Sequence, residues 1–117
     1  MREWLSRRMA TAFEVLAEPN RRRILDLLLT TESPVGDIVE SVALSQPLVS
    51  KHLRVLREAG LVEARIDAQR RIYRVCAEPL RAMDEWLKPY RRLWAERLDA
   101  LEEHLQTMED HNDDARP

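Results

Sequence analysis

The polar side chains between Ser45 and Ala59 are of the types that make hydrogen bonds and charge contacts with a polyanion. If this segment is a helix, Val49, Leu53 and Leu56 share its buried face, because steps of four and three residues separate them. The opposite side then presents Pro47, Ser50, Lys51, Arg54 and Glu58, with Gln46 and His52 beside it. Gln, Ser, Lys and Arg side chains pair with base edges in the DNA major groove. The alternative is a merely solvated face, which every amphipathic helix has.

Three helices are expected before this segment. Apolar residues at steps of three and four predict the first helix over about residues 3–17. Pro19 fits the first turn of the second helix, because a missing N–H does no harm there. A loop is predicted from Thr30 to Pro34, and a short third helix then ends near Val42.

The segment itself begins and ends with strong helix signals. Ser45 is a favourable N-cap, and Gly60 supplies the left-handed residue that follows a helix. Two alternating segments within residues 62–75 flank a polar turn and predict a β-hairpin. A long helix with coiled-coil-like apolar spacing follows over about residues 79–108, and Pro89 is expected to kink it or split it in two.

These elements predict a mainly α fold with a small β-hairpin, in the order α-α-α-α-β-β-α. Two short helices joined by a tight turn make a helix-turn-helix over residues 34–59, and its second helix can enter the major groove. The hairpin over 62–75 is expected to be a wing, made basic by Arg65, Arg70, Arg71 and Arg74. We expect a single domain over residues 1–108 and a disordered tail over 109–117.

The net charge of −2 hides a strong segregation along the chain. Residues 45–75 contain seven basic and three acidic side chains, whereas residues 76–117 contain six basic and eleven acidic ones. A basic patch on an acidic frame binds a polyanion through its local field. A winged helix that serves only as a protein-docking or dimerisation module is the alternative, and it has no need of this segregation.

Composition argues against several other classes of protein. No apolar run approaches the roughly 18 residues that span a bilayer, and the N-terminus lacks a secretion signal. Cys76 is the single cysteine, which fits a reducing cytoplasm and predicts a packed or incidental thiol. There is neither a nucleophile beside a base nor a glycine-rich phosphate loop, so we expect no enzyme and no cofactor.

Four stretches carry a family resemblance: LAEPNRRRILDLL, LSQPLVSKHLRVLREAGLV, RRIYRV and WLKPYRRLWAERLDALEEHL. Over about residues 10–106 the chain resembles the ArsR/SmtB family of winged-helix bacterial repressors. The resemblance implies a homodimeric, sequence-specific repressor that binds a palindromic operator in double-stranded DNA. By position it implies DNA contacts from Ser45, Gln46, Ser50, Lys51, His52, Arg54, Arg70 and Arg71. Glu18 stands where the family usually has Asp or Gly before the helix proline, which weakens the expected cap.

A dimer is also expected from the apolar stripe of the last helix, which exceeds what one small domain needs to cover. The helices over residues 1–17 and 78–108 would form the interface. The residues expected there are Trp4, Leu5, Trp86, Leu87, Tyr90, Trp94, Leu98, Leu101 and Leu105. The alternative is that all of them pack within one chain.

Metal sites known in the family are poorly matched. The third-helix region, SPVGDIVESVA, has no Cys or His, so the Cys-x-Cys type of site is absent. Near the C-terminus, Glu102-x-His104 and His111-x-x-Asp114 only approximate the second type, and solvated surface is the simpler interpretation. The chain looks closest to a metal-independent branch with a WLxPYRRxW-type helix. A metal-responsive repressor using His104 and His111 stays the alternative, and the sequence indicates no inducer.

Overall fold

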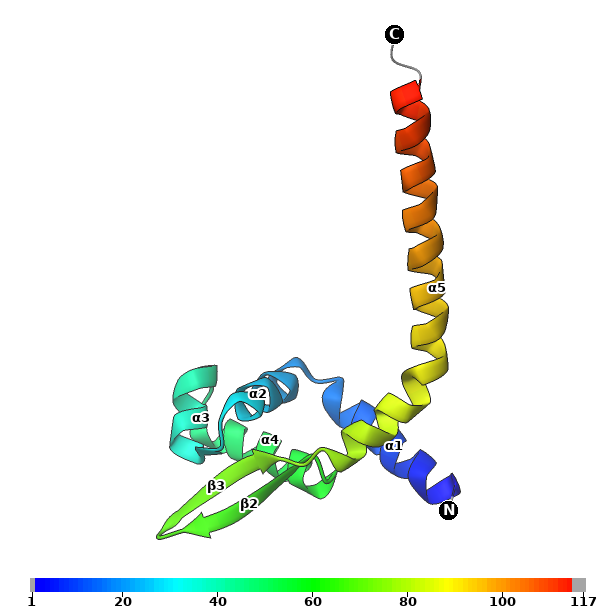
Figure 1. Cartoon of the computed structure of the whole chain (residues 1–117). Helices are drawn as coiled ribbons and strands as arrows, with labels where there is room; N and C mark the ends of the chain where they lie inside the picture. The colour runs from blue at the N-terminus through cyan, green and yellow to red at the C-terminus, as the bar shows by residue number, and fades with distance from the viewer. Residues whose placement is uncertain (1, 115–117) are drawn as a thin grey trace. The chain divides into compact units, whose positions relative to one another are not determined.

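The computed structural model describes the backbone of residues 2–114 and the side chains of residues 7–111. Its elements are α1 (Arg2–Leu16), α2 (Pro19–Thr30), β1 (Ser33–Pro34), α3 (Val35–Val42), α4 (Gln46–Glu58), β2 (Val62–Asp67), β3 (Arg70–Val75) and α5 (Glu78–Asp114) (Figure 1). The chain divides into two compact units, residues 1–83 and 84–117, and each is described by itself. The predicted mainly helical fold with a small antiparallel hairpin is confirmed. No described helix has the length and apolar character needed to cross a membrane.

The hairpin belongs to a three-stranded antiparallel sheet with the order β1-β3-β2. In β2 and β3, Val62 pairs with Val75 and Asp67 pairs with Arg70. The segment from Thr30 to Pro34 was expected to be a loop, but Ser33 and Pro34 pair with β3. A strand of two residues has no alternation to read, and Pro34 can sit there because β1 is at the edge of the sheet.

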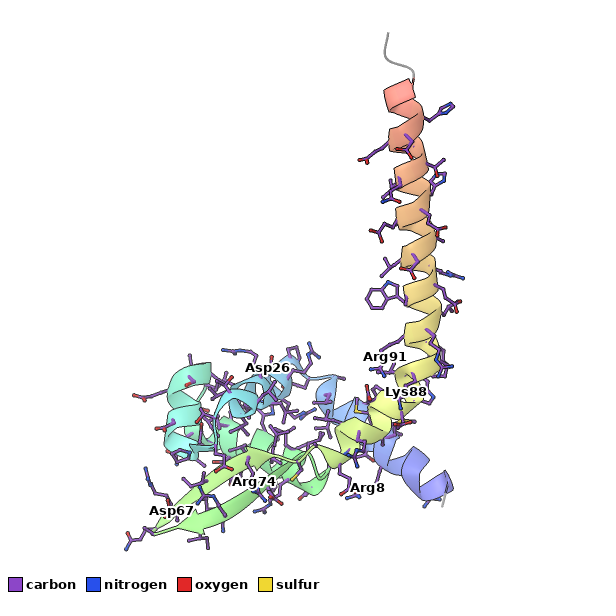
Figure 2. All side chains as sticks on the ribbon, viewed as in Figure 1. Arg8, Asp26, Asp67, Arg74, Lys88 and Arg91 are labelled. Carbon is purple, nitrogen blue, oxygen red and sulfur yellow. The ribbon has the colours of Figure 1, made fainter. Side chains whose placement is uncertain are left out.

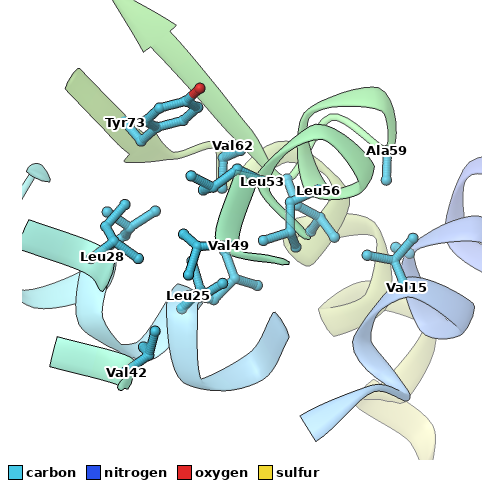
Figure 3. Close-up of a cluster of buried hydrophobic side chains, with 14 residues drawn as sticks. Val15, Leu25, Leu28, Val42, Val49, Leu53, Leu56, Ala59, Val62 and Tyr73 are labelled. Carbon is cyan, nitrogen blue, oxygen red and sulfur yellow. The ribbon is translucent and has the colours of Figure 1, made fainter. Parts of the chain in front are cut away.

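The first unit has one apolar core, shown in Figure 3. Val49, Leu53 and Leu56 of α4 are at most 1 % exposed, which confirms them as the inner face of that helix. Leu28 of α2 and Tyr73 of β3 belong to the same cluster, so α4 is held against both a helix and the sheet. This packing fixes how α4 is rotated, and therefore which of its side chains face solvent.

Both ends of α4 have the expected signals. The hydroxyl of Ser45 accepts a hydrogen bond from the Leu48 N–H at 3.3 Å, as an N-cap does. At the other end, Gly60 has a φ of 76°, and the Leu61 N–H donates to the carbonyl of Leu56 at 2.9 Å. This left-handed closure satisfies a terminal carbonyl and turns the chain into β2.

The cap of α2 corrects an expectation. Glu18 was expected to weaken it, but one of its carboxylate oxygens accepts a hydrogen bond from the Arg21 N–H at 3.0 Å. The longer Glu side chain therefore reaches the same backbone group that a shorter Asp would bind, and its charge suits a helix N-terminus.

We expect Glu18→Ala to lower the free energy of unfolding by about 1 kcal/mol, because a helix N-terminal N–H loses its acceptor. Urea denaturation followed by circular dichroism measures this loss. Glu40→Ala, which removes an exposed carboxylate from α3, is the control and should change stability by less than about 0.5 kcal/mol. Equal effects of the two substitutions would show that the Glu18 cap contributes nothing.

Helix α5 is longer than expected. It is continuous through Pro89, so the helix is not split there, and it extends to Asp114. Residues 109–114, expected to belong to a disordered tail, are therefore helical, and residues 115–117 lie outside the described part of the chain. Pro89 is exposed, so the carbonyl of Glu85 that loses its partner N–H is left near solvent.

Candidate nucleic-acid interface

The exposed face of α4 forms one wall of an open groove of about 540 Å³. The groove is lined by Val35, Gln46, Pro47, Ser50, Lys51, Arg54, Arg57, Arg71 and Tyr73. Four of these residues are basic and none is acidic. We call this feature the basic groove, and its charge suits a polyanionic ligand.

Two of the wing arginines that were expected to be available are paired with carboxylates. Arg65 donates to Glu32 at 3.0 Å, and Arg74 forms an ion pair with Glu63 across the hairpin. Figure 2 labels Arg74 on β3. Their charge is thus partly neutralised, and neither residue lines the basic groove.

The remaining cations carry the positive field of the groove. Among the residues that the structure describes, Lys51, Arg54, Arg57 and Arg71 have no salt bridge. Their side chains are exposed to solvent. A phosphate group entering the groove would therefore meet cations that need not break an existing ion pair.

The two other predicted wing residues differ in which hollows they line. Arg71 lines the basic groove, together with side chains of α4. Both Arg70 and Arg71 line a neighbouring hollow of about 320 Å³, together with Asp37 at the start of α3. Arg70 lines only the hollow that contains a carboxylate, which makes it the weaker candidate of the two for a phosphate contact.

His52 was predicted as a DNA contact, and its position does not fit that role. The residue is only 8 % exposed, and its Nε2 atom lies 3.8 Å from a carboxylate oxygen of Glu18. It therefore lies on the side of α4 that faces the N-terminus of α2. From the sequence, His52 was placed at the edge of the polar face. It comes one residue before the buried Leu53, and this position on the helix turns it towards the core.

Arg57 was not among the predicted contacts, although its spacing in the sequence indicates it. Ser50, Arg54 and Arg57 follow one another at steps of four and three, so they share a face of α4. Tyr73 also lines the groove, although its ring is buried, and no pattern in the sequence indicates this. Of the predicted α4 contacts, Gln46, Ser50, Lys51 and Arg54 meet at the groove, whereas Ser45 is the helix cap.

Apolar side chains expected at a dimer interface follow one another along α5. Large exposed hydrophobic residues there are Trp86, Tyr90, Leu93, Trp94, Leu98, Leu101, Leu105 and Met108, and Leu87 is half-buried. Leu93 and Met108 were not predicted. The rings of Trp86 and Tyr90 pack at a centroid distance of 4.9 Å. The side chains of Trp4 and Leu5, also expected at the interface, lie outside the described residues.

The candidate metal residues His104 and His111 are both exposed on α5. Among the described side chains, no group of three or more His, Cys, Asp and Glu residues is arranged to hold a metal ion. The side chain of Asp114 is outside that description.

Cys76 follows β3 and is half-buried. Burial raises the pKa of its thiol, and the carboxylate of Glu63 raises it further through repulsion and a hydrogen bond. The reactive species is the thiolate, so a raised pKa means that less of it is present at any given pH.

We therefore expect Cys76 of the folded protein to react with iodoacetamide more slowly at pH 8 than free cysteine, whose pKa is about 8.5. Mass spectrometry of timed samples gives the rate. Glu63→Gln should accelerate alkylation by removing the repelling charge. Unfolding in urea should abolish the difference in rate between Cys76 and free cysteine. A folded protein that reacts faster than free cysteine would contradict this prediction.

A helix-turn-helix followed by a basic hairpin defines the class of winged-helix DNA-binding proteins. Comparison with known proteins agrees with that class. Residues 18–64 match the family described as bacterial regulatory protein, arsR family. The chain is 39 % identical over 54 residues to the transcriptional repressor SdpR of Bacillus subtilis. The aligned region covers 46 % of this chain and 60 % of SdpR. It is also 35 % identical over 82 residues to the transcriptional activator HlyU of Vibrio cholerae. That aligned region covers 70 % of this chain and 76 % of HlyU.

A solved structure extends the likeness over most of the chain. The homodimeric winged helix-turn-helix DNA-binding domain of Mb0332 from Mycobacterium bovis, a possible ArsR-family regulator, has a TM-score of 0.63 and 31 % identity. The likeness covers 91 % of this chain and 89 % of that one. The chain thus belongs to the ArsR family of DNA-binding transcriptional regulators, which are not enzymes.

Proposed function

We propose that the protein is a homodimeric, cytoplasmic repressor that binds a palindromic operator through the major groove of double-stranded DNA. Helix α4 is the recognition helix, with Gln46, Ser50, Lys51 and Arg54 in reach of base edges. Arg71 of the wing contacts the flanking backbone, with Arg70 beside it. Residues 34–59 and 62–75 form the DNA-binding part of the proposed domain, 1–108.

The observation that carries this proposal is the basic groove. Its four cations have no salt bridge among the described residues, and no acidic side chain lines it. A surface that docked a protein without an acidic patch would gain nothing from holding four uncompensated charges together. SdpR is named a repressor and HlyU an activator, so relatives allow either direction of regulation. We favour repression, because a small dimer on a promoter blocks access without needing an activation surface.

We propose that dimerisation uses the helices over residues 1–17 and 78–108, and that release from DNA does not depend on a metal. The apolar side chains of α5 are exposed in the single chain and need a partner surface. His104 and His111 are exposed histidines seven residues apart, which is a common surface arrangement. If zinc or nickel at stoichiometric concentration released the operator, a metal-responsive repressor would be the correct description.

We expect Arg54→Ala to lower the preference for the operator over unrelated DNA by about 1–3 kcal/mol, because a base contact is lost. Arg71→Ala should weaken binding to both duplexes alike. It should also reduce the dependence of the affinity on salt concentration by the amount that about one phosphate contact contributes. The operator is first selected from random duplexes with the unsubstituted protein. Electrophoretic mobility shift at two salt concentrations then measures both effects.

Arg74→Ala is the matched control, because that wing arginine is paired with Glu63 and lies outside the basic groove. It should change DNA affinity less than about 3-fold. If the unsubstituted protein selected no duplex, and all three variants bound DNA as it does, the protein-docking module would be favoured instead.

A further inference from the structure

Three consecutive arginines in the first turn of α2 donate hydrogen bonds to the ends of neighbouring helices. Arg21 and Arg22 donate to the carbonyls of residues 15–17, at distances between 2.6 Å and 3.1 Å. These carbonyls are at the C-terminal end of α1. Arg23 instead donates to the carbonyl of Val42 at 2.9 Å, which is the last residue of α3. The same turn of α2 therefore binds the ends of two different helices.

Helix α3 has few stabilising groups of its own at its two ends. It is eight residues long, and its N-cap is Pro34, whose side chain has no group that could accept a hydrogen bond. Its sequence, VGDIVESV, contains no Lys, Arg or His that could interact with its own last carbonyls. The C-cap residue, Ala43, has a left-handed φ of 56°, which is unfavourable for a residue with a Cβ atom.

The guanidinium of Arg23 supplies what α3 lacks. A cation near the C-terminus of a helix is stabilising, because the last carbonyls carry partial negative charge. Helices as short as α3 are marginal by themselves and depend on contacts with the rest of the protein. We therefore expect the last turn of α3 to depend on α2 for its position.

We propose that Arg23 is a positioning residue for DNA recognition, and that it acts by fixing the turn between α3 and α4. This inference rests on the proposed binding of the operator by α4. Only residues 43–45 separate Val42 from Gln46, the first residue of α4. A guanidinium that holds the Val42 carbonyl therefore limits the direction in which the chain enters the recognition helix.

The Arg23 side chain is itself held at a second nitrogen. Its Nη1 atom donates to Oδ1 of Asn20 at 3.1 Å, while its Nη2 atom donates to Val42. Two bonds from one planar guanidinium restrict its rotation more than a single bond would. Helix α2 is anchored in the core by Ile24 and Leu25, which are both buried. Arg23 thus connects the end of α3 to a rigid part of the first unit.

A direct phosphate contact by Arg23 would give a different result from a positioning role. Phosphate contacts contribute to all DNA sequences, so their loss weakens binding to the operator and to unrelated DNA alike. A displaced α4 loses base contacts but keeps the cations of the basic groove, which Arg23 does not line. The ratio of the two affinities therefore separates a positioning residue from a phosphate contact.

Arg23→Ala removes the bond to the end of α3, and Arg22→Ala, the matched control, removes the bonds to the end of α1. Both side chains are exposed and belong to the same turn of α2. Mobility shift at one salt concentration gives the affinities for the selected operator and for an unrelated duplex. We expect Arg23→Ala to lower the ratio of these affinities at least about 5-fold, as the loss of one base contact does. Arg22→Ala should leave the ratio almost unchanged.

Amide hydrogen exchange in the full-length protein shows whether the turn responds. The Ala43 N–H donates to the carbonyl of Val39 at 3.0 Å, and Arg23→Ala should speed its exchange more than Arg22→Ala does. A general loss of stability would lower both DNA affinities together and leave their ratio intact. Asn20→Ala is the milder variant, because it frees only one side of the guanidinium, and it should lower the ratio by a smaller factor. It decides the question if Arg23→Ala does not fold.

A lower ratio together with faster exchange at Ala43, neither of which occurs in the Arg22 variant, supports the positioning role. An unchanged ratio in both the Arg23 and the Asn20 variants overturns it, and so does an equal loss of affinity on both duplexes. Either result leaves the proposed repressor intact, provided that the natural protein still prefers the operator. Absence of that preference in the natural protein overturns the proposed function itself.

Discussion

Replacing Leu98 with glutamate is expected to convert the proposed dimer into monomers and to weaken operator binding at least about 100-fold. Leu98 is 49 % exposed in the single chain and lies at the centre of the α5 stripe. A charge at this position would have to be buried in an apolar contact, which costs several kcal/mol without a partner. Light scattering gives the mass, and mobility shift on the palindromic operator gives the affinity.

The affinity falls because the two recognition helices are no longer held together in one dimer. In a dimer, binding of one recognition helix holds the second near its half-site, about 34–36 Å away. A monomer must bind each half-site independently, so the gain from a high effective concentration disappears. Binding to a single half-site should be nearly unchanged, because the basic groove is in the other unit of the chain.

Thr107→Glu is the matched control for this experiment. It adds the same charge to α5, but its position is turned away from the stripe, so the dimer and the operator affinity should persist. A Leu98→Glu variant that remains dimeric and binds the operator normally would show that the stripe is not the dimer contact.

The second large effect is expected from Leu53→Ala, which should lower the free energy of unfolding by about 2–5 kcal/mol. Leu53 is 1 % exposed and is part of the core cluster that holds α4. Truncation leaves a cavity between α4 and the rest of the core, and the surrounding side chains close it only in part. Since native domains are stable by roughly 5–15 kcal/mol, this loss is a large fraction of the total.

Urea denaturation monitored by circular dichroism measures the change, as the shift of the midpoint at constant slope. Leu48→Ala is the control, because Leu48 is on the same helix but 37 % exposed, and it should cost less than about 1 kcal/mol. If both substitutions cost the same, Leu53 is not a core residue and the rotation of α4 derived from it is wrong.

The sequence by itself determined the helices, the β2–β3 hairpin and the rotation of α4. Val49, Leu53 and Leu56 occupy one helix face at steps of four and three, and burying them leaves Ser50, Lys51 and Arg54 outside. Such local periodicity, together with caps such as Ser45, acts over a few residues and can be read directly. The apolar stripe of α5 was readable for the same reason, because it also repeats within one helix.

Only the tertiary structure decided which cations are available. Arg65 and Glu32 are 33 residues apart in sequence, yet their side chains form an ion pair, whereas Arg71 has no salt bridge to any side chain that the structure describes. The burial of His52 against Glu18 and the pairing of β1 with β3 also depend on contacts between distant segments. Charge content is a property of composition, but pairing and burial depend on which segments the folded chain brings together.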